Sequence, residues 1–537
     1  MVYWELLDMM EYKNKIIVIL LIQLLLLLPL SGCILSSNQT INTYQTIIVG
    51  VHGDIQGFYP QANSFDVDTV GFNFNIYEAL VFRQSDFTIA PRLAKSWTNP
   101  DNLTWRFKLQ DNVLFHNNDP LTVEDVKYSL DFIINNNQSM YQELVKPIHN
   151  ITLIDNKTIE IRTKKPTPLL LNTLVELPII NKDYIEGADH SWPIGTGPYQ
   201  LANYTPKTNY TLKRFEHYWG DLPDVKTVVV SIMHNTSDTY SALLSQEIQI
   251  TTISLKNISE VEKTKGVHSI TITTPSVTYL SFNFAEKSAS NQSITNPLKH
   301  QKVREALSHC INISAFLANV TNNSLDAANQ LVSPHIYGYN PDIQAPEYDV
   351  ELAKSLLSEA GYPDGFNLTL DIPEYWNTEN MPIGDEIAHQ LKSIINVSVN
   401  SMPGPEYYSK ILLRESDFYL MSWLATTGDA EEVYSYILHS VDDKGGKGSY
   451  NLGYYHNPTI DSIADNISYI MNSRRRLETM QSGFEIAMDD VYCIPLYHTK
   501  VHYGIVDGLS WEPRPDLSLL FEEIHINSKV AESKTLF

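Results

Sequence analysis

The 537-residue chain is short of cysteine, of positive charge and of apolar runs beyond its N-terminal region. No pair among Cys33, Cys310 and Cys493 has metal-site spacing, which argues against a cysteine-held metal. Only 38 Lys and Arg stand against 62 Asp and Glu, and the net charge of −24 makes nucleic acid an unexpected partner. Because Gly-X-Ser-X-Gly and His-Glu-X-X-His are both missing, the sequence gives no sign of an enzyme.

The one long apolar run lies at residues 16–30 and ends just before Ser31-Gly32-Cys33. A basic start, an apolar stretch and a small-residue cleavage site are typical of a secretory signal. Cysteine after Leu-Ser-Gly resembles a lipoprotein signal, so residues 1–32 are predicted to be a signal peptide and Cys33 the lipidation site. Residues 33–45 then form a polar tether. Two alternatives remain, an uncleaved membrane anchor, for which the run is short, and cleavage without lipid.

In each of these cases the rest of the chain lies outside the cytoplasm, and a lipid would hold it at the extracytoplasmic face of the membrane. About 500 residues are too many for one hydrophobic core, so two or more lobes are expected. Short β-type runs alternate with helical patterns. The clearest predicted strands cover residues 46–51, 105–109, 158–161 and 227–232. The clearest helices have caps at Thr122 and Asp349 or cover residues 299–307.

Four segments carry recognisable motifs in a fixed order. They read APRLAKSW at 90–97, PIGTGPY at 193–199, VREAL at 303–307 and AKSLLSEAGYPDG at 353–365. Together they resemble the family-5, or cluster C, extracellular solute-binding proteins of peptide and nickel ABC transporters. The resemblance covers about residues 46 to 505. It departs from the family at Asn117-Asn118, where a glycine is usual in second place, and at Ile311-Asn312, where Ile-Asp-Arg is usual.

Most of these motif residues are expected to be structural. The glycines of the second motif allow a tight backbone path, and the tryptophans of the first pack cores. Cys310 lies on an apolar helical stripe and is expected to be a buried, inert thiol. The residues given a structural role are Trp97, Trp105, Phe107, His116, Gly195, Thr196 and Gly197.

The resemblance implies a two-lobed α/β fold of the periplasmic-binding-protein type (type II, cluster C), with an enlarged first lobe and a ligand cleft between the lobes. Lobe I would cover residues 46–278, include an inserted subdomain and be completed by residues 498–537. Lobe II would cover residues 279–497. The chain would cross between them near 278–283 and 494–497. Such a protein works without a cofactor, as a monomer, and delivers its ligand to ABC permease subunits.

The segment from Tyr419 to Asp429 decides which ligand the resemblance implies. In peptide-binding members an aspartate three residues after a tryptophan pairs with the peptide α-amine, because a desolvated ammonium needs a counter-charge. Here Trp423 is the tryptophan, and Thr426 stands at the aspartate position. Asp429 matches a second acidic position and could take over that role, or it could cap the helix expected to begin at Ala430. Trp423 is predicted to contact the ligand, with core packing as the alternative.

Nickel-binding members use a histidine downstream of the same tryptophan. His439 lies sixteen residues after Trp423, near that place but out of clear register, and it is the weak candidate for a metal ligand. A histidine in an apolar stretch is more often structural. Nickel or a nickel chelate is therefore an alternative ligand rather than the leading one.

Other cleft-lining groups follow from position in the family pattern. They lie after the first strand, at the start of the next helix, on the crossing strand and in an aromatic loop. They are Phe58, Tyr59, Asn75, Tyr77, Tyr279, Asn283, Tyr375, Trp376 and Asn377. Aromatic rings with few fixed polar groups would give a permissive cleft.

The leading prediction is a lipoprotein that captures oligopeptides between two closing lobes for an ABC importer. Nickel chelates and other solutes, such as sugars or opines, are alternatives within the family. An alternative of another class is a ligand-sensing surface module that keeps the fold and passes its ligand to a receptor.

Overall fold

The computed structural model describes residues 45–60, 67–136, 139–187, 192–321, 324–378, 381–442, 444 and 446–527. Residues Thr46–Ile526 form one compact unit. The predicted signal peptide, the lipidation site Cys33 and nearly all of the predicted tether lie outside the described residues. Within the described ranges no helix is long and apolar enough to cross a bilayer.

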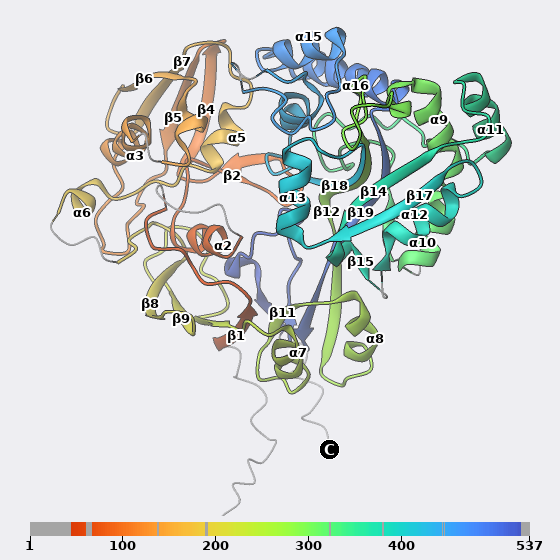
Figure 1. Cartoon of the computed structure of the whole chain (residues 1–537). Coiled ribbons are helices and arrows are strands. Elements are labelled where there is room, and N and C mark those ends of the chain that lie inside the picture. The colour runs from red at the N-terminus through yellow and green to blue at the C-terminus, as the bar shows by residue number, and fades with distance from the viewer. Residues whose placement is uncertain are drawn as a thin grey trace, which may run out of the picture. The chain divides into compact units, whose positions relative to one another are not determined.

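An eleven-stranded mixed sheet runs through this unit (Figure 1). Its order is β17-β14-β18-β12-β19-β11-β1-β10-β9-β8, and β13 pairs with β19 off this path. The strands are β1 (Thr46–Val51), β8 (Tyr199–Thr205), β9 (Asn209–Arg214), β10 (Thr227–Ile232), β11 (Ile250–Ile253), β12 (Val267–Phe282), β13 (Asp326–Ala327), β14 (Asn367–Pro373), β17 (Asn396–Met402), β18 (Phe418–Leu424) and β19 (Cys493–Val506). The predicted strands 46–51 and 227–232 are confirmed and pair with each other in parallel.

Two long antiparallel strands form the middle of the sheet. β12 has 16 residues and β19 has 14, and they pair along most of their length with two register shifts. β19 continues the sheet toward β11 and β1, and β12 continues it toward β18 and β14. The predicted crossings at 278–283 and 494–497 fall on these strands. The lobe boundaries predicted there, 278/279 and 497/498, stay a prediction.

Helices cover both faces of the sheet around β12 and β18 (Figure 1). Tyr279 and Tyr419 point into one core and their neighbours Leu280 and Leu420 into the other, because successive strand residues face opposite sides. The first core includes side chains of α13 (Gly404–Leu412), α15 (Pro458–Ile467) and α16 (Ser473–Asp489). The second includes side chains of α9 (Gln301–Cys310), α10 (Ile313–Thr321), α11 (Val350–Glu359) and α12 (Ile383–Leu391).

A separate four-stranded sheet follows the order β4-β5-β7-β6. Its strands are β4 (Ala94–Asp101), β5 (Thr104–Leu109), β6 (Ile148–Leu153) and β7 (Thr158–Thr163), and α3 (Val123–Asn135) packs against it. Trp105 and Phe107 are buried in its core, as expected for motif residues with a structural role. Thr122 and Asp125 form the predicted capping box of α3.

The Gly-Thr-Gly motif has a steric cause. The loop lies so close to the end of α2 (Val67–Ile76) that a Cβ on Gly195 would come within 2.0 Å of the Ile76 carbonyl oxygen, and one on Gly197 within 2.7 Å. His116 is tied to this loop, since its Nε2 lies 3.0 Å from the Gly197 oxygen and its Nδ1 accepts the Gly195 N–H. These residues hold the backbone together, as the sequence predicts.

The predicted helix ends are partly confirmed. Asp349 caps α11 by accepting the Leu352 N–H at 2.9 Å. The third predicted helix does not begin at Lys299. Residues Pro297–Lys299 form a 3-10 turn capped by Asn296, and α9 begins only at Gln301. Cys310 and Cys493 are buried and free.

Candidate functional site

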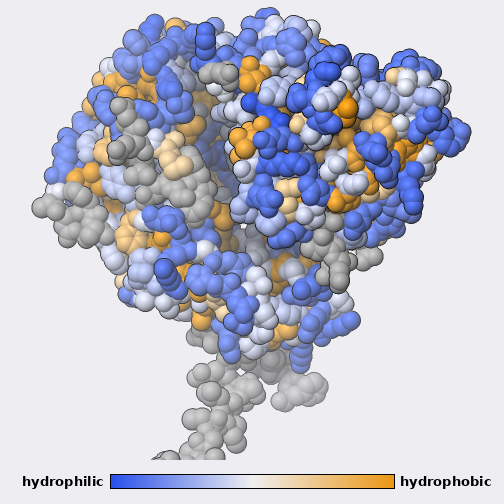
Figure 2. All heavy atoms as spheres, in the orientation of Figure 1, coloured by the Kyte–Doolittle hydropathy of each residue, from blue (hydrophilic) through white to orange (hydrophobic). Residues whose placement is uncertain are grey.

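The chain that leaves β18 forms a contact between distant parts of the fold. In the loop from Ala425 to Ala430, the Thr427 carbonyl accepts a hydrogen bond from Asn172 of α5 (Leu170–Val175) at 2.9 Å. Gly428 has φ +76°, and a Cβ there would lie 2.9 Å from the Cβ of Phe87. Phe87 lies in the turn after β2 (Val81–Arg83), so the loop contacts this turn and α5. Nearby, the surface is hollowed between the part that carries β2 and β4 to β7 and the part that carries α13 (Figure 2).

Asp429 is engaged inside the fold rather than free. Its side chain is 5% exposed, and its two carboxylate oxygens lie 2.5 and 2.8 Å from the guanidinium nitrogens of Arg476 on α16. It also accepts the Glu431 N–H at 2.9 Å, next to α14 (Glu431–Val433). This geometry favours the structural, cap-like interpretation over the ligand-binding one, which stays an untested prediction.

Glu432 is the carboxyl group that sequence reasoning missed. Its Oε2 accepts from the exposed hydroxyl of Thr426 at 3.4 Å, and its buried Oε1 has no hydrogen-bond partner among the described residues. Burial raises the pKa of Glu432 to about 8, although the Thr427 amide and the charge of Arg83 oppose this shift. The residue that replaces the expected aspartate thus lies directly beside another acid.

Three aromatic side chains form a cluster at the same place. The Trp423 ring centroid lies 5.2 Å from that of Tyr450 and 6.3 Å from that of Tyr436. Both tyrosines are 44% exposed, whereas Trp423 is partly buried and its Nε1–H has no hydrogen-bond partner within the described part of the chain. Trp423, Tyr436 and Tyr450 are called the aromatic cluster below. The exposed rings offer apolar and π surface to a ligand.

The predicted lining residues before β2 mostly hold the fold together. The Asn75 Nδ2 donates to the Leu519 carbonyl at 2.8 Å, and its Oδ1 accepts the Phe521 N–H at 2.9 Å. The Tyr77 hydroxyl donates to the Phe58 carbonyl at 2.8 Å. These bonds tie α2 to the C-terminal segment and to the chain after β1.

The aromatic residues after β1 pack against other rings. Phe58 has its ring centroid 5.3 Å from that of Tyr204, and Tyr59 has its own 5.5 Å from that of Phe132. Neither ring is fully buried, so both keep some surface for a ligand. Burial and the neighbouring Tyr128 raise the pKa of Tyr59 to about 12.

The crossing-strand candidates are buried. Tyr279 lies in the core beside β12, and Asn283 donates to the Asp417 carboxylate at 2.9 Å. In the later loop, the hydroxyls of Tyr375 and Tyr408 lie 3.0 Å apart, and both side chains are exposed. Trp376 packs on the core that α9 to α12 share, and the side chain of Asn377 lies outside the described part of the structure. Of these residues, Tyr279 belongs to the core against which Trp423 packs.

His439 has neighbours of its own. Its Nδ1 lies 2.6 Å from the Ser440 carbonyl oxygen, and its Nε2 is 3.6 Å from Asp465. Asp465 itself pairs with Lys447 at 2.5 Å. In the described ranges no group of three or more His, Cys, Asp or Glu side chains could hold a metal ion.

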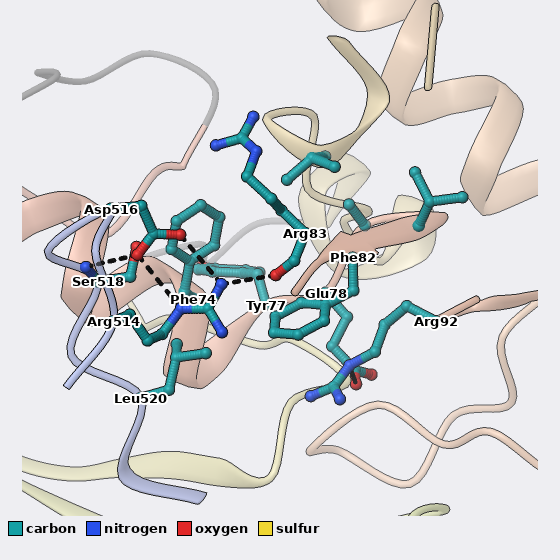
Figure 3. Close-up of a pocket in the computed structure, with 13 residues that line it drawn as sticks. Phe74, Tyr77, Glu78, Phe82, Arg83, Arg92, Arg514, Asp516, Ser518 and Leu520 are labelled. Atoms are coloured by element: carbon teal, nitrogen blue, oxygen red, sulfur yellow. Dashed lines mark hydrogen bonds and ion pairs between the residues drawn. The ribbon is translucent and has the colours of Figure 1, made fainter. Parts of the chain in front are cut away.

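A small cavity of about 30 Å³ lies beside β2 (Figure 3). Tyr77 and Glu78 line it, and Arg514 spans it by pairing with Asp516 at 3.0 Å and donating to the Arg83 carbonyl at 2.6 Å. The Arg83 guanidinium points away from Arg514 in Figure 3 and pairs with Glu176 at 2.8 Å. The cavity is too small for a peptide, and Arg83, which lines it, is the cation whose charge lowers the pKa of Glu432.

Comparison with known proteins gives the context of this site. The Escherichia coli K12 dipeptide-binding protein is 26% identical over 438 residues, 75% of this chain and 80% of that protein. The Salmonella typhi glutathione-binding protein is 26% identical over 407 residues, 72% of this chain and 76% of that protein. The Haemophilus influenzae heme-binding protein A is 25% identical over 466 residues, 79% of this chain and 82% of that protein.

Solved structures show the same two-lobed α/β fold, which confirms the predicted fold class. A substrate-binding protein of a Listeria monocytogenes ABC transporter has a TM-score of 0.78 at 22% identity, over 90% of this chain and 99% of that one. A Helicobacter pylori periplasmic binding protein in complex with the peptide STSA has a TM-score of 0.69 at 23% identity, over 90% of this chain and 98% of that one. The family description "bacterial extracellular solute-binding proteins, family 5 middle" matches residues 88–445. Since that match spans more than half of the 537 residues, the chain belongs to the family-5 extracellular solute-binding proteins, which are transport components rather than enzymes.

Proposed function

We propose that this protein is the peptide-binding component of an ABC importer, which captures oligopeptides and delivers them to permease subunits in the membrane. The names of the relatives carry the proposal, because proteins that align with about three quarters of this chain at 26% identity are named as binding dipeptides or glutathione. The aromatic cluster supports it, since exposed rings with few fixed polar groups suit side chains of varied sequence.

The proposal includes the predicted placement of the protein. Cys33 would carry the lipid that holds the chain at the extracytoplasmic face of the membrane, and a monomer would meet the permease. Metabolic labelling with a radioactive fatty acid tests this directly. Label in the unaltered protein and none in Cys33→Ser is the expected result, and label in both would exclude lipidation at Cys33.

Calorimetry tests the ligand. The chain from Ser36 to Phe537, which contains the whole compact unit Thr46–Ile526, is unfolded and refolded to remove bound ligand. It is titrated with a mixed tri- to pentapeptide pool and, separately, with nickel in the presence and absence of free histidine. Micromolar or tighter peptide binding is expected. Binding that needs nickel would instead support the metal alternative and His439, although the described residues offer it no complete ligand set.

Deletion of the gene distinguishes a role in peptide import from a role in ligand sensing. Deletion of the gene should abolish growth on peptides as the sole source of a required amino acid, while growth on the free amino acid continues. Unimpaired peptide uptake, together with a lost transcriptional response to peptides, would favour the ligand-sensing alternative.

A further inference from the structure

We propose that Glu432 and the aromatic cluster bind the ammonium group of the ligand, in place of the aspartate that peptide-binding members carry at the Thr426 position. This inference rests on the proposed peptide-binding function. It assigns the charge role to a residue six positions after Thr426, and not to Asp429, which matches the family pattern better.

Three neighbouring carboxylates differ in the partners that the fold gives them. Asp429 and Glu431 both pair with Arg476, and Glu431 also accepts from Ser468 at 2.6 Å. Glu432 has no ion pair among the described residues, and one of its buried oxygens has no partner. A buried acceptor without a partner is costly, so it marks a place where a cationic donor from outside the chain would be stabilised.

Aromatic side chains lie close to Glu432 in the fold. Tyr436 lies one helical turn after Glu432, and burial, followed by the charge of Glu432, raises the pKa of its hydroxyl. The Tyr436 hydroxyl therefore lies within electrostatic reach of the carboxylate. The ring centroids of Trp423 and Tyr436 are 6.3 Å apart, so both rings belong to the surroundings of Glu432. A carboxylate bordered by aromatic faces is the arrangement that binds ammonium groups through charge pairing and cation–π contact together.

Glu432 contacts a residue at the protein surface. Thr426 is exposed, and its hydroxyl lies 3.4 Å from Oε2 of Glu432, so the carboxyl group is in contact with a side chain at the surface. The charged groups that face Glu432 are Asp429 from the loop and Arg83 from β2. Arg83 is already paired with Glu176, which leaves Glu432 available to a ligand.

A change of protonation follows. With its pKa near 8, the ligand-free carboxyl holds its proton at neutral pH. An ammonium favours the ionised form, so the carboxyl releases its proton to solvent when the ligand binds, and the ammonium keeps its own. Calorimetry in two buffers with different ionisation enthalpies measures this release.

The test compares Glu432→Gln with the unaltered protein on a mixed tripeptide pool and on the same pool N-acetylated. Gln has the shape of the protonated acid, so the fold is kept, and only the negative charge is lost. We expect at least about tenfold weaker binding of the free-amine pool and little change for the acetylated pool. Glu431→Gln makes the same change at a carboxylate that already has partners, and it should leave the ratio of the two affinities unchanged.

Several outcomes would overturn the inference. Equal losses for both pools would remove the charge role of Glu432 while peptide binding stands. If Glu432→Gln does not fold, the unaltered protein still provides a test. Binding of the free-amine pool without proton release would also remove the charge role of Glu432. No binding of either pool by the unaltered protein would overturn the proposed function as well.

Discussion

At the scale of single residues, the site differs from the family pattern by one substitution, and the structure shows what surrounds it. The sequence alone showed that Thr426 stands where peptide-binding members have an aspartate, because that position lies three residues after the motif tryptophan, here Trp423. It singled out Asp429, which matches a second acidic position of the family, and missed Glu432 three residues later. The two carboxylates differ in that Asp429 is paired with Arg476 and Glu432 has no such ion pair among the described residues. Arg476 lies 47 residues after Asp429 in the chain, so a local sequence pattern does not show this pairing.

The pair between Asp429 and Arg476 gives the first prediction. Asp429→Ala leaves a buried guanidinium without its main partner, and breaking such a pair costs about 3–5 kcal/mol, here toward the lower end because Glu431 remains. We expect a lower thermal midpoint and similar losses of affinity for free-amine and N-acetylated peptides. A selective loss of the free-amine peptides would instead restore Asp429 as the ligand's counter-charge.

The pKa of Glu432 gives a prediction about pH. Between about 4.5 and 8 the unfolded chain has lost this proton and the folded protein still holds it. The unfolded state binds fewer protons there, so this group lowers stability as pH rises through the window. Glu432→Gln cannot ionise, and its thermal midpoint should match that of the unaltered protein near pH 5 and exceed it by about 2–4 °C above pH 8. A constant difference across pH would show that Glu432 titrates normally.

At the scale of elements, local chemistry allowed the sequence to predict several boundaries. Thr122 and Asp349 cap their helices as predicted, because a cap depends on residues within one turn. The predicted start of α9, Lys299, was two residues too early, since Asn296 and Pro297 favour a separate 3-10 turn. The glycines 195 and 197 were recognised as backbone residues, but the carbonyl of Ile76 that they approach lies about 120 positions earlier and is not visible in a local pattern.

The loop after β18 gives a prediction at this scale. Gly428→Ala places a methyl group 2.9 Å from the Cβ of Phe87 in a positive-φ conformation. Gly361→Ala is the matched control, because it has φ +92° but nothing within 4 Å of the added methyl. Both variants should lose about 1 kcal/mol or more from backbone strain, and only Gly428→Ala should also weaken peptide binding. Equal binding by the two variants would show that the contact with Phe87 does not matter for the ligand.

At the scale of the whole molecule, the family motifs predicted the two-lobed α/β class, whereas the order of the strands lay beyond the sequence. β1 pairs with β10 and β11, about two hundred residues later, and such pairing leaves no local signal. The crossings were predicted near residues 278–283 and 494–497, but the structure has single strands of 16 and 14 residues there. β12 and β19 are hydrogen-bonded to each other within one sheet. A hinge at this place would therefore have to bend both paired strands together.

One hydrogen bond could link ligand binding to the closing of the two predicted lobes. Asn172 of α5 donates to the Thr427 carbonyl at 2.9 Å, next to the residues proposed to hold the ligand. If this bond forms only when the lobes close on a ligand, Asn172→Ala destabilises the closed form alone, and peptide affinity falls by up to about fivefold. Asn150→Ala, an exposed asparagine of β6 bonded to Thr152, is the control.

Small-angle X-ray scattering of both variants decides between two explanations. A larger radius of gyration for peptide-saturated Asn172→Ala than for Asn150→Ala would show that the bond stabilises closure. If affinity and radius are unchanged, the bond is present in the open and closed forms alike, because a contact that does not differ between two states cannot shift their populations. The loop after β18 would then keep this contact in both forms, and closure would depend on the ligand's own contacts with Glu432 and the aromatic cluster.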